Sequence, residues 1–559
     1  MQRISLRSIL VLLFICFEIT APNALPNHEP VDTIYTNGVL WTGDPSKPTA
    51  EALAVKGEYI AAVGSNTEIL KSKGSSTQVV DLKGRFVTPG FNDAHLHFLV
   101  RPEVELNESD DLKTIQKKLR DFVAAHPDST WILGRGWGYT SFPDRKPHRR
   151  YLDEIVKDRP VRLSERDGHM LVLNSKALEL SHITRKTPDP DKGRIIRDEK
   201  GEPTGELQES AMDLVNHLIP DPDPAEMYSA LKDLLDRAAS YGLTSAQNAS
   251  FEEADLPVFE RVLKENGLKV RFRWAVDFKN NATASDFAHF RSLSARFPEK
   301  VMKFGAAKGF LDGVVDAQTA AMFEPYTTGK NGIALWKQED LNEAAALYDR
   351  EGFQILLHAI GDKAIAMALD AYEHVIAVNG PRDRRDRIEH IEVPRLSDYA
   401  RFKKLGVIAS TQALFANPDK TTLDNYAVLL GPARASHANA FKLFDDAGAV
   451  QAFGSDWPVF SMEVLRGIYC AAARKTAEGT PLNGWYPENR ITVEAALHHF
   501  TVDAAYAGFD EKVKGTLSPG KLADFVVLSD NILQPPVERV LQTKVVMTVM
   551  GGKITYGSL

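Results

Sequence analysis

The stretch LNEAAALYDREGFQILLHA, residues 341–359, contains one complete helix–glycine–strand unit. Its first part has apolar residues at the spacing of an amphipathic helix, and FQILLHA forms a short, mostly apolar run after Gly352. Glycine suits the left-handed position that ends a helix. A short apolar run predicts a strand buried on both faces, as in a parallel sheet. The unit therefore predicts a helix that leads back to a parallel strand.

The same unit recurs along the middle of the chain. Helical spacing of apolar residues predicts helices over 226–241, 259–266, 396–405 and 441–447, and each is followed by a glycine and then by a short apolar segment. Alternating helices and buried strands predict a parallel sheet with right-handed crossovers. Five such units, with more sequence before them, favour an α/β fold with a (β/α)8 TIM barrel. An open doubly wound sheet is the alternative.

The two ends of the chain follow a different pattern. Residues 31–88 contain short β segments separated by turns. Residues 511–559 contain ADFVVLS and then VVMTVMGGKITYG, whose two glycines indicate a hairpin. We expect both ends to form one small β-sandwich domain beside a barrel that covers residues 89–510.

The first 24 residues resemble a targeting segment. Arg3 and Arg7 precede the apolar run ILVLLFICF, and Ala24 offers a small residue for cleavage. This order predicts a signal peptide over residues 1–24 and a location in the secretory pathway, extracellular or periplasmic. The run is short for a membrane span, so we expect no stable membrane insertion after cleavage. An uncleaved anchor is the alternative.

Composition excludes several classes of protein and of site. The 559 residues are 43% hydrophobic and 25% charged, which is ordinary for a globular protein. The formal net charge is −8, and the sequence has no basic stripe of the kind that binds nucleic acid. Cys16 and Cys470 are the two cysteines, too few for a disulfide framework or a cysteine-based zinc site. Any metal must be held by histidine, carboxylate or a less usual ligand.

Metal-type residues stand at the ends of the predicted strands. His95 and His97 are two apart in FVTPGFNDAHLHF, so an extended chain points both imidazoles to one face. His358 ends FQILLH, His390 ends RIEH and Asp456 ends AVQAFGSD. Active sites of TIM barrels lie where the strands end, and imidazole with carboxylate binds zinc-like cations. Taken alone, His358 could be a hydrogen-bonded core histidine and Asp456 a helix N-cap.

A lysine supplies the less usual ligand. Two adjacent cations need a bridging anion, and the carbamate that forms from lysine and CO2 offers two oxygens. Lys308, in FGAAKGFLDG, is the candidate, and Lys303 is a competing choice earlier in the strand. A plain ion pair between Lys308 and Asp312 is the alternative.

Eight motifs follow one another in a characteristic order: TPGFNDAHLHF, GRGWGYTSFPDRKPHRRYLD, RPVRLSERDGHMLVLNSKAL, KGFLDG, LLHAIGD, RIEHIE, AFGSDWPV and GTLSPGKLADFVVLS. As a set they resemble the amidohydrolase superfamily, in particular its amidohydrolase-3 or YtcJ-like group, which includes N-substituted formamide deformylases. The resemblance covers about residues 31–559. The chain departs from the family pattern after KGFLDG, where Val314, Val315 and Asp316 replace small residues and alter the expected pocket wall.

The resemblance implies roles for named residues. It implies one or two divalent metal ions, with zinc expected, and a carboxylated lysine between them. The first metal would be held by His95 and His97, the second by His358 and His390, with Lys308 as the bridge and Asp456 as ligand and catalytic acid/base. The family also implies a small-molecule substrate and a homodimer.

Further residues are candidates for substrate contact. His169, in RDGHMLVLNS, is the candidate for substrate binding or oxyanion support, with a structural hydrogen bond as the alternative. Arg135 and Trp137, in GRGWGY, would line the pocket, although Trp137 suits a plain core position equally well. Glu209 is more typical of a helix surface. A further pair, His498 and His499, is typical of packing or surface positions on a helix.

These features predict a metal-dependent hydrolase of a non-peptide C–N bond in an amide, formamide or cyclic amide. A metal-activated water would attack the carbonyl, and Asp456 would take its proton and deliver it to the leaving amine. The alternatives are an ester or lactone hydrolase with the same site, and a non-catalytic regulatory protein that keeps the fold.

Overall fold

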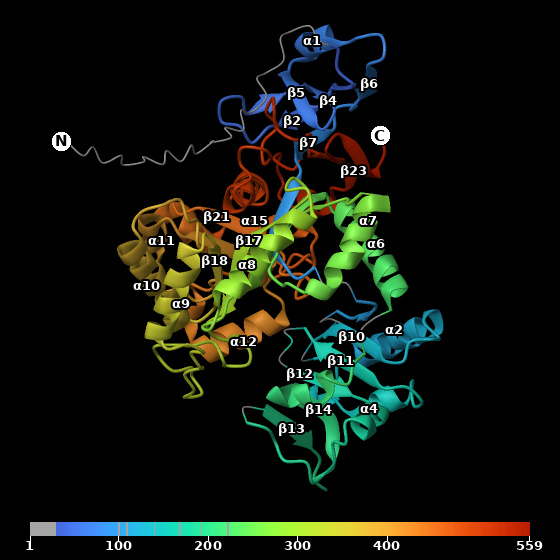
Figure 1. Ribbon diagram of the computed structural model, residues 1–559, viewed down its shortest axis with the longest axis vertical. Helices are drawn as coiled ribbons and strands as arrows, with labels where there is room; N and C mark the ends of the chain where they lie inside the picture. The colour runs from blue at the N-terminus through green and yellow to red at the C-terminus, as the bar shows by residue number, and fades with distance from the viewer. Residues whose placement is uncertain are drawn as a thin grey trace, which may run out of the picture.

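Figure 1 shows the computed structural model, in which three parts follow one another along the long axis. The structure describes residues 30–559 except 99–100, 108–109, 139, 167, 169, 192, 221–222 and 266. The signal peptide expected over 1–24 and the candidate His169 lie outside the described residues. A β-domain built from both ends lies at the top of the view, the barrel in the middle, and a separate lobe at the bottom.

The middle part is the expected (β/α)8 barrel. Eight strands form one sheet in the order β21-β20-β19-β18-β17-β16-β15-β8, and every ladder recorded between neighbours is parallel. The strands are β8 (Phe91–Leu96), β15 (Leu243–Asn248), β16 (Arg271–Asp277), β17 (Met302–Phe310), β18 (Gln354–Ala359), β19 (Arg387–His390), β20 (Ile408–Gln412) and β21 (Gln451–Gly454). The TIM-barrel prediction is confirmed, and the open sheet is excluded.

Helices connect the barrel strands and cover their outer face (Figure 1). They are α6 (Pro224–Ser240), α7 (Leu256–Glu265), α8 (Ala284–Leu293), α9 (Gln338–Arg350), α10 (Asp362–Asn379), α11 (Tyr399–Leu405), α12 (Lys420–Leu430), α13 (Pro432–Ala435), α14 (Phe441–Ala447), α15 (Val464–Ala473), α16 (Val493–His499) and α17 (Val502–Ala507). The five predicted terminating glycines all have positive φ, between 67° and 88°: Gly242, Gly267, Gly352, Gly406 and Gly448. They end the helices because only glycine adopts this conformation without a Cβ penalty. Among the described residues, no helix combines the length and the apolar character needed to cross a bilayer.

Both ends of the chain contribute to the β-domain. One sheet has the order β5-β4-β1-β6 and the other β24-β23-β22-β7-β2-β3. Their shared core joins residues that lie far apart in sequence, such as Leu53, Phe525 and Val549. The strands are β1 (Thr33–Thr36), β2 (Val39–Trp41), β3 (Thr49–Ala50), β4 (Ala52–Lys56), β5 (Tyr59–Gly64), β6 (Gln78–Asp81), β7 (Phe86–Pro89), β22 (Phe525–Leu528), β23 (Val545–Met550) and β24 (Lys553–Gly557).

An inserted lobe separates the first barrel strand from the second, a feature that the sequence analysis did not anticipate. It consists of a six-stranded sheet, β13-β14-β12-β11-β10-β9, with short helices. Its elements are β9 (Val104–Glu105), α2 (Leu112–Ala125), β10 (Ile132–Trp137), α3 (Arg149–Asp153), β11 (Val161–Glu165), β12 (Met170–Leu173), α4 (Ser175–Leu180), β13 (Gly193–Arg197), β14 (Pro203–Glu209) and α5 (Asp213–Asn216). The lobe lies at the end of the barrel opposite the β-domain (Figure 1).

Backbone contacts between the first and last strands close the barrel beside the candidate site. The N–H of Asp456 donates to the carbonyl of His95 at 2.7 Å, and the N–H of His97 donates to the carbonyl of Trp457 at 2.7 Å. A Cβ on Gly454 would lie 2.5 Å from the backbone nitrogen of His95, so only glycine permits this approach. The closure therefore places Asp456 directly against the two histidines of β8.

Candidate metal centre

Two imidazoles from the end of β8 begin the site. His95 is fully buried, and its ring centroid lies 5.4 Å from that of His97. Each ring is held from behind: Nδ1 of His95 lies 2.5 Å from Oε2 of Glu389, and Nδ1 of His97 contacts Oγ of Ser250. These contacts leave Nε2 of both rings directed toward the same carboxylate.

That carboxylate belongs to Asp456, which follows β21. Its Oδ1 lies 3.0 Å from Nε2 of His97 and 3.3 Å from Nε2 of His95. Asp456 has a φ of +57°, a conformation rarely held by residues other than glycine and one that is often found at functional sites. In the described chain Asp456 does not act as a helix N-cap, since α15 begins after Glu463.

The neighbouring strands β18 and β19 supply the second pair of imidazoles. The rings of His358 and His390 lie 4.5 Å apart, and the His390 ring lies 4.9 Å from that of His95. Nδ1 of His390 lies 2.8 Å from Oε1 of Gln412. Nε2 of His358 lies 3.2 Å from the carbonyl oxygen of Gly313. One of its two ring nitrogens therefore has the hydrogen-bond partner expected of a core histidine.

Lys308 ends in the same space. Its side chain is buried, and Nζ makes no hydrogen bond with any group that the structure describes. Asp312 does not pair with it, because that carboxylate accepts backbone N–H groups of Ala321, Ile360 and Gly361. The competing Lys303 is tied to Asp510. Of the two lysines, Lys308 is therefore the one that the structure brings to the histidines.

A buried ion pair supports the site from inside the barrel. Glu389 receives two hydrogen bonds from Arg387, at 2.8 and 3.0 Å, and its Oε2 also contacts His95. Burial opposes ionisation, but Arg387 and His95 hold the pKa of Glu389 well below its ordinary value. A carboxylate behind a metal-binding histidine fixes the ring and raises its basicity. Sequence reasoning missed this pair, although RIEH puts Arg387 and Glu389 on one face of the strand.

Burial and neighbouring charges shift the pKa values of the groups at the site. Burial lowers the pKa of His390 to about 3 and, together with the charge of His390, lowers the pKa of His358 well below its ordinary value. Burial raises the pKa of Asp456, but contacts with His95 and His97 outweigh it and hold that pKa well below its ordinary value. Burial also lowers the pKa of Lys308 to about 8. Neutral imidazoles at His358 and His390 and an ionised Asp456 are therefore favoured. At His95, burial opposes protonation, but Glu389 and Asp456 outweigh it and raise the pKa.

The buried donor and acceptor atoms of the site fit a divalent cation. Nε2 of His95 and Oδ1 of Asp456 face each other at 3.3 Å without a well-aligned hydrogen bond, and Nζ of Lys308 makes no hydrogen bond with a described group. Ligand atoms of His95, His390 and Asp456 all lie within 4.8 Å of one another. Buried polar atoms are rarely left unsatisfied, and nitrogen and carboxylate donors at this spacing are typical zinc ligands.

The metal-type residues surround one cavity of about 190 Å³, with His95 buried beneath its floor. The divergent residues Val314, Val315 and Asp316 line its wall. Aromatic side chains form another part of the wall, and the ring of Phe415 stacks on His390 at 5.6 Å. The cavity therefore joins a polar floor to apolar walls, a combination that suits a small organic substrate.

Other candidate residues lie elsewhere. Trp137 is buried in the core of the lobe, donates to the carbonyl of Leu163 at 3.0 Å and does not line the cavity. Arg135 lines a neighbouring cavity. Glu209 ends strand β14, so the expectation of a helix surface is wrong. His499 is buried in α16 between Asp445 and Asp503, as expected for a packing residue.

Comparison with known proteins places these motifs in a family. The model of the amidohydrolase family matches residues 78–556. Protein LONG AFTER FAR-RED 3 of Arabidopsis thaliana is 33% identical over 94% of this chain and 91% of its own length. N-substituted formamide deformylase of Arthrobacter pascens is 26% identical over 94% and 98%, respectively. The crystal structure of an uncharacterized metal-dependent hydrolase from Pyrococcus furiosus is 25% identical, with a TM-score of 0.70 over 90% of this chain and all of that one. The resemblance seen in the sequence is confirmed, and this chain belongs to the amidohydrolase family.

Proposed function

We propose that this protein is a metal-dependent hydrolase of a non-peptide C–N bond in a small amide, formamide or cyclic amide. The observation that carries the proposal is the convergence of three imidazoles, Asp456 and Lys308 on one cavity at the mouth of the barrel, with the buried His95 in contact with Asp456. The relative whose name states deformylation of N-substituted formamides supports the C–N bond as the target.

Five residues and a modified lysine would hold the metal. His95, His97, His358, His390 and Asp456 have the ligand atoms, and Lys308 would bridge two ions once CO2 has converted its amine to a carbamate. A divalent ion held by these residues, with zinc as the expected metal, would supply Lewis acidity to activate a water and to polarise a carbonyl.

The protein groups move the proton and position the substrate. Asp456 is ionised and stands among the imidazoles, so it can accept the proton of the nucleophile and return it to the leaving amine nitrogen. Contacts with His95 and His97 hold the Asp456 carboxylate in one position, and a fixed position favours proton transfer. Phe310, which is 49% exposed at the cavity wall, offers an apolar surface for the organic part of the substrate.

The proposal extends to the start of the chain. Residues 1–24 would direct the protein into the secretory pathway and be removed there. Mass determination of the protein recovered from a secreting host tests this, since a mature chain that begins after Ala24 is expected.

Turnover of a matched substrate panel tests the function. N-benzylformamide, N-benzylacetamide, a cyclic amide and the corresponding benzyl esters are incubated with zinc-loaded protein, and acid release is measured. The protein should hydrolyse at least one amide, and Asp456→Asn should lower kcat by about 100-fold or more while zinc remains bound. Asp128→Asn, at an exposed position, is the control and should behave as the parent.

The outcomes separate the candidate activities. Hydrolysis of the esters with no turnover of any amide would replace the C–N proposal by an esterase. Full amide turnover by Asp456→Asn would remove Asp456 from the role of acid and base. Zinc bound at the site without turnover of any compound would favour the regulatory alternative.

A further inference from the structure

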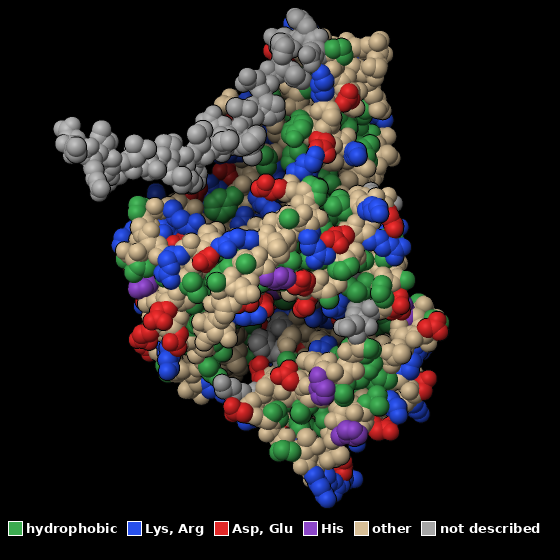
Figure 2. Space-filling model, in the orientation of Figure 1, with side chains coloured by type: hydrophobic (Ala, Val, Ile, Leu, Met, Phe, Trp, Pro, Cys, Tyr) green, Lys and Arg blue, Asp and Glu red, His purple; other side chains and the backbone are tan. Residues whose placement is uncertain are grey.

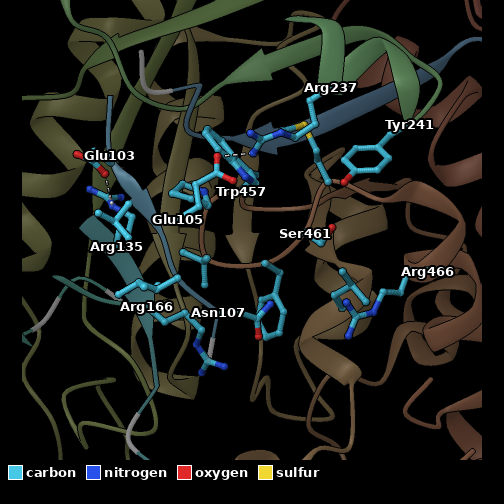
Figure 3. A pocket seen from close by; sticks show the side chains of 18 of the residues that line it. Glu103, Glu105, Asn107, Arg135, Arg166, Arg237, Tyr241, Trp457, Ser461 and Arg466 are labelled. Carbon is cyan, nitrogen blue, oxygen red and sulfur yellow. Dashed lines mark hydrogen bonds and ion pairs between the residues drawn. The ribbon is translucent and has the colours of Figure 1, made fainter. Parts of the chain in front are cut away.

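A second cavity, of about 250 Å³, adjoins the metal site. It lies where the inserted lobe meets the barrel, between β9 and β10 on one side and the segment after β21 on the other (Figure 3). The space-filling view is hollowed along this boundary between barrel and lobe (Figure 2). Arg166, Val459 and Phe460 line both cavities, so the two spaces are neighbours separated by these side chains.

Positive charge dominates the second cavity. Figure 2 shows acidic and basic side chains intermingled over the outer surface of this face. The cavity wall, in contrast, has five arginines and two glutamates: Arg101, Arg135, Arg166, Arg237 and Arg466, with Glu103 and Glu105. This excess of cations in a concave site raises the local concentration of anions.

Protein carboxylates neutralise two of the arginines closely. Arg237 pairs with Glu105, and NH1 of Arg101 donates to Asp255 at 3.1 Å. These two guanidinium groups have the acceptors that a buried or half-buried charge requires. Arg101 and Arg237 therefore have structural roles at the rim of the cavity.

Arg135 and Arg466 are less closely paired. Nε of Arg135 lies 3.9 Å from Glu103, beyond hydrogen-bond distance, and this buried Nε makes no hydrogen bond with a described group. Arg466, on α15, makes no hydrogen bond or ion pair in the part of the chain that the structure describes. A buried donor without an acceptor is costly, and the Nε of Arg135 is such a donor, whereas Arg466 is half-buried. Arg135 therefore lacks the close protein acceptor that Arg101 and Arg237 have.

Arg166 connects the two cavities. Its guanidinium lies 5.0 Å above the ring of Phe460 and 3.9 Å from Asp316, one of the residues that departs from the family pattern. Arg166 follows β11 of the lobe, whereas Asp316 follows β17 of the barrel. The lobe thus contributes a cation at the border between the metal cavity and the arginine cavity.

We propose that the substrate carries a carboxylate that binds Arg135 in the arginine cavity while its scissile C–N bond lies at the metal site. Arginine matches a carboxylate with two parallel N–H donors, which gives direction as well as affinity. Arg166 stands beside the part of the substrate that joins the two groups. The position of the scissile bond rests on the proposed hydrolase function, and the carboxylate site adds the substrate class.

Matched probes that differ in one charge test the inference. The pairs are 4-(formamidomethyl)benzoate with its primary carboxamide, and 4-(acetamidomethyl)benzoate with its primary carboxamide. Release of formate or acetate gives kcat/KM on the zinc-loaded protein, and calorimetry gives the Kd on the non-hydrolysing Asp456→Asn variant. The carboxylates should bind and react about 10- to 100-fold better than the carboxamides, as expected for charge-assisted hydrogen bonds.

Arginine variants show whether the preference arises in this cavity. Arg135→Gln should reduce the preference for the carboxylates by about tenfold and change the Kd of the carboxamides little. Arg185→Gln is the control, because Arg185 is exposed on the lobe and pairs with Glu202 away from both cavities. It should leave the preference unchanged.

Binding tests the carboxylate site, and turnover tests the amide-hydrolase proposal, so each can be contradicted separately. Carboxylates that bind no tighter than carboxamides in both pairs would overturn the inference, even if both compounds are hydrolysed. Charge-selective binding without turnover would keep the anion site and contradict the amide-hydrolase proposal. Inorganic phosphate that binds Asp456→Asn with the same sensitivity to Arg135→Gln, in the absence of any carboxylate preference, would assign the cavity to a free anion and overturn the inference.

Discussion

Glu389 lies directly behind His95, where its negative charge is shared between the imidazole and Arg387. The amide in Glu389→Gln keeps the shape but removes the charge that orients His95 and makes it basic. We expect metal affinity to fall by about 10- to 100-fold, as measured by competition with a chelator.

Controls separate this effect from a loss of folding. Glu260→Gln removes an exposed carboxylate paired with Arg296 and should leave metal affinity unchanged. Circular dichroism reports whether the fold of each variant is intact. An unaltered affinity in a folded Glu389→Gln protein would show that the buried pair does not tune the site.

Lys308 and Lys303 lie on the same strand and offer a matched pair of variants. Metal-free protein reconstituted with zinc should bind more metal when bicarbonate is present, because CO2 converts Lys308 into an anionic ligand. Lys308→Ala should lose this dependence, whereas Lys303→Ala should keep it, since Lys303 is paired with Asp510. A bicarbonate effect that survives in Lys308→Ala, measured by elemental analysis, would refute the carbamate.

At the scale of elements, the contact between β8 and β21 holds the site together. Gly454→Ala places a methyl group 2.5 Å from the backbone nitrogen of His95, so the two strands must separate. We expect a loss of about 1–3 kcal/mol in the free energy of unfolding together with weaker metal binding. Gly467→Ala, whose Cβ would meet side-chain atoms at 3.1–3.3 Å, is the milder control. Equal urea midpoints for the two variants would contradict the proposed tight approach.

Helix α16 contains a pH-dependent contact remote from the cavity. Burial opposes protonation of His499, but Asp445 and Asp503 raise its pKa to about 9. Because the pKa of His499 in the folded protein exceeds its ordinary value of about 6.5, the stabilisation is complete below pH 6.5 and is lost as the pH rises through about 9.

Unfolding by urea at pH 6 and pH 9.5 measures this contribution. The difference in unfolding free energy between the parent and His499→Gln should narrow by up to about 3 kcal/mol at the higher pH. The exposed His217→Gln should show no such trend. A constant difference for His499→Gln would mean that the imidazole is not charged in the folded protein.

Much of the barrel and its metal-type residues could be predicted from local sequence. A glycine after an amphipathic helix indicates the end of that helix, and all five predicted glycines have a positive φ. Histidines and an aspartate at strand ends indicate a site because the barrel gathers those ends on one face. Local pattern alone thus predicted that His358 and Asp456 stand at the ends of barrel strands.

The inserted lobe and the supporting residues could not be predicted in the same way. The lobe pairs short strands across large sequence separations, so no single periodic segment reveals it. Glu389 and Arg387 resemble surface charges in sequence, and only their burial inside the barrel gives them a role. The arginine cavity combines side chains from the lobe and the barrel, such as Arg135 and Arg466, and exists only after folding.

At the scale of the whole molecule, the proposed hydrolysis requires a bound metal. The most direct measurement is elemental analysis of the purified protein combined with turnover of the formamide and amide panel before chelation, after chelation and after zinc is restored. One or two ions per chain, loss of turnover on chelation and recovery with zinc are predicted. Undiminished hydrolysis by the metal-free chain would contradict the central claim.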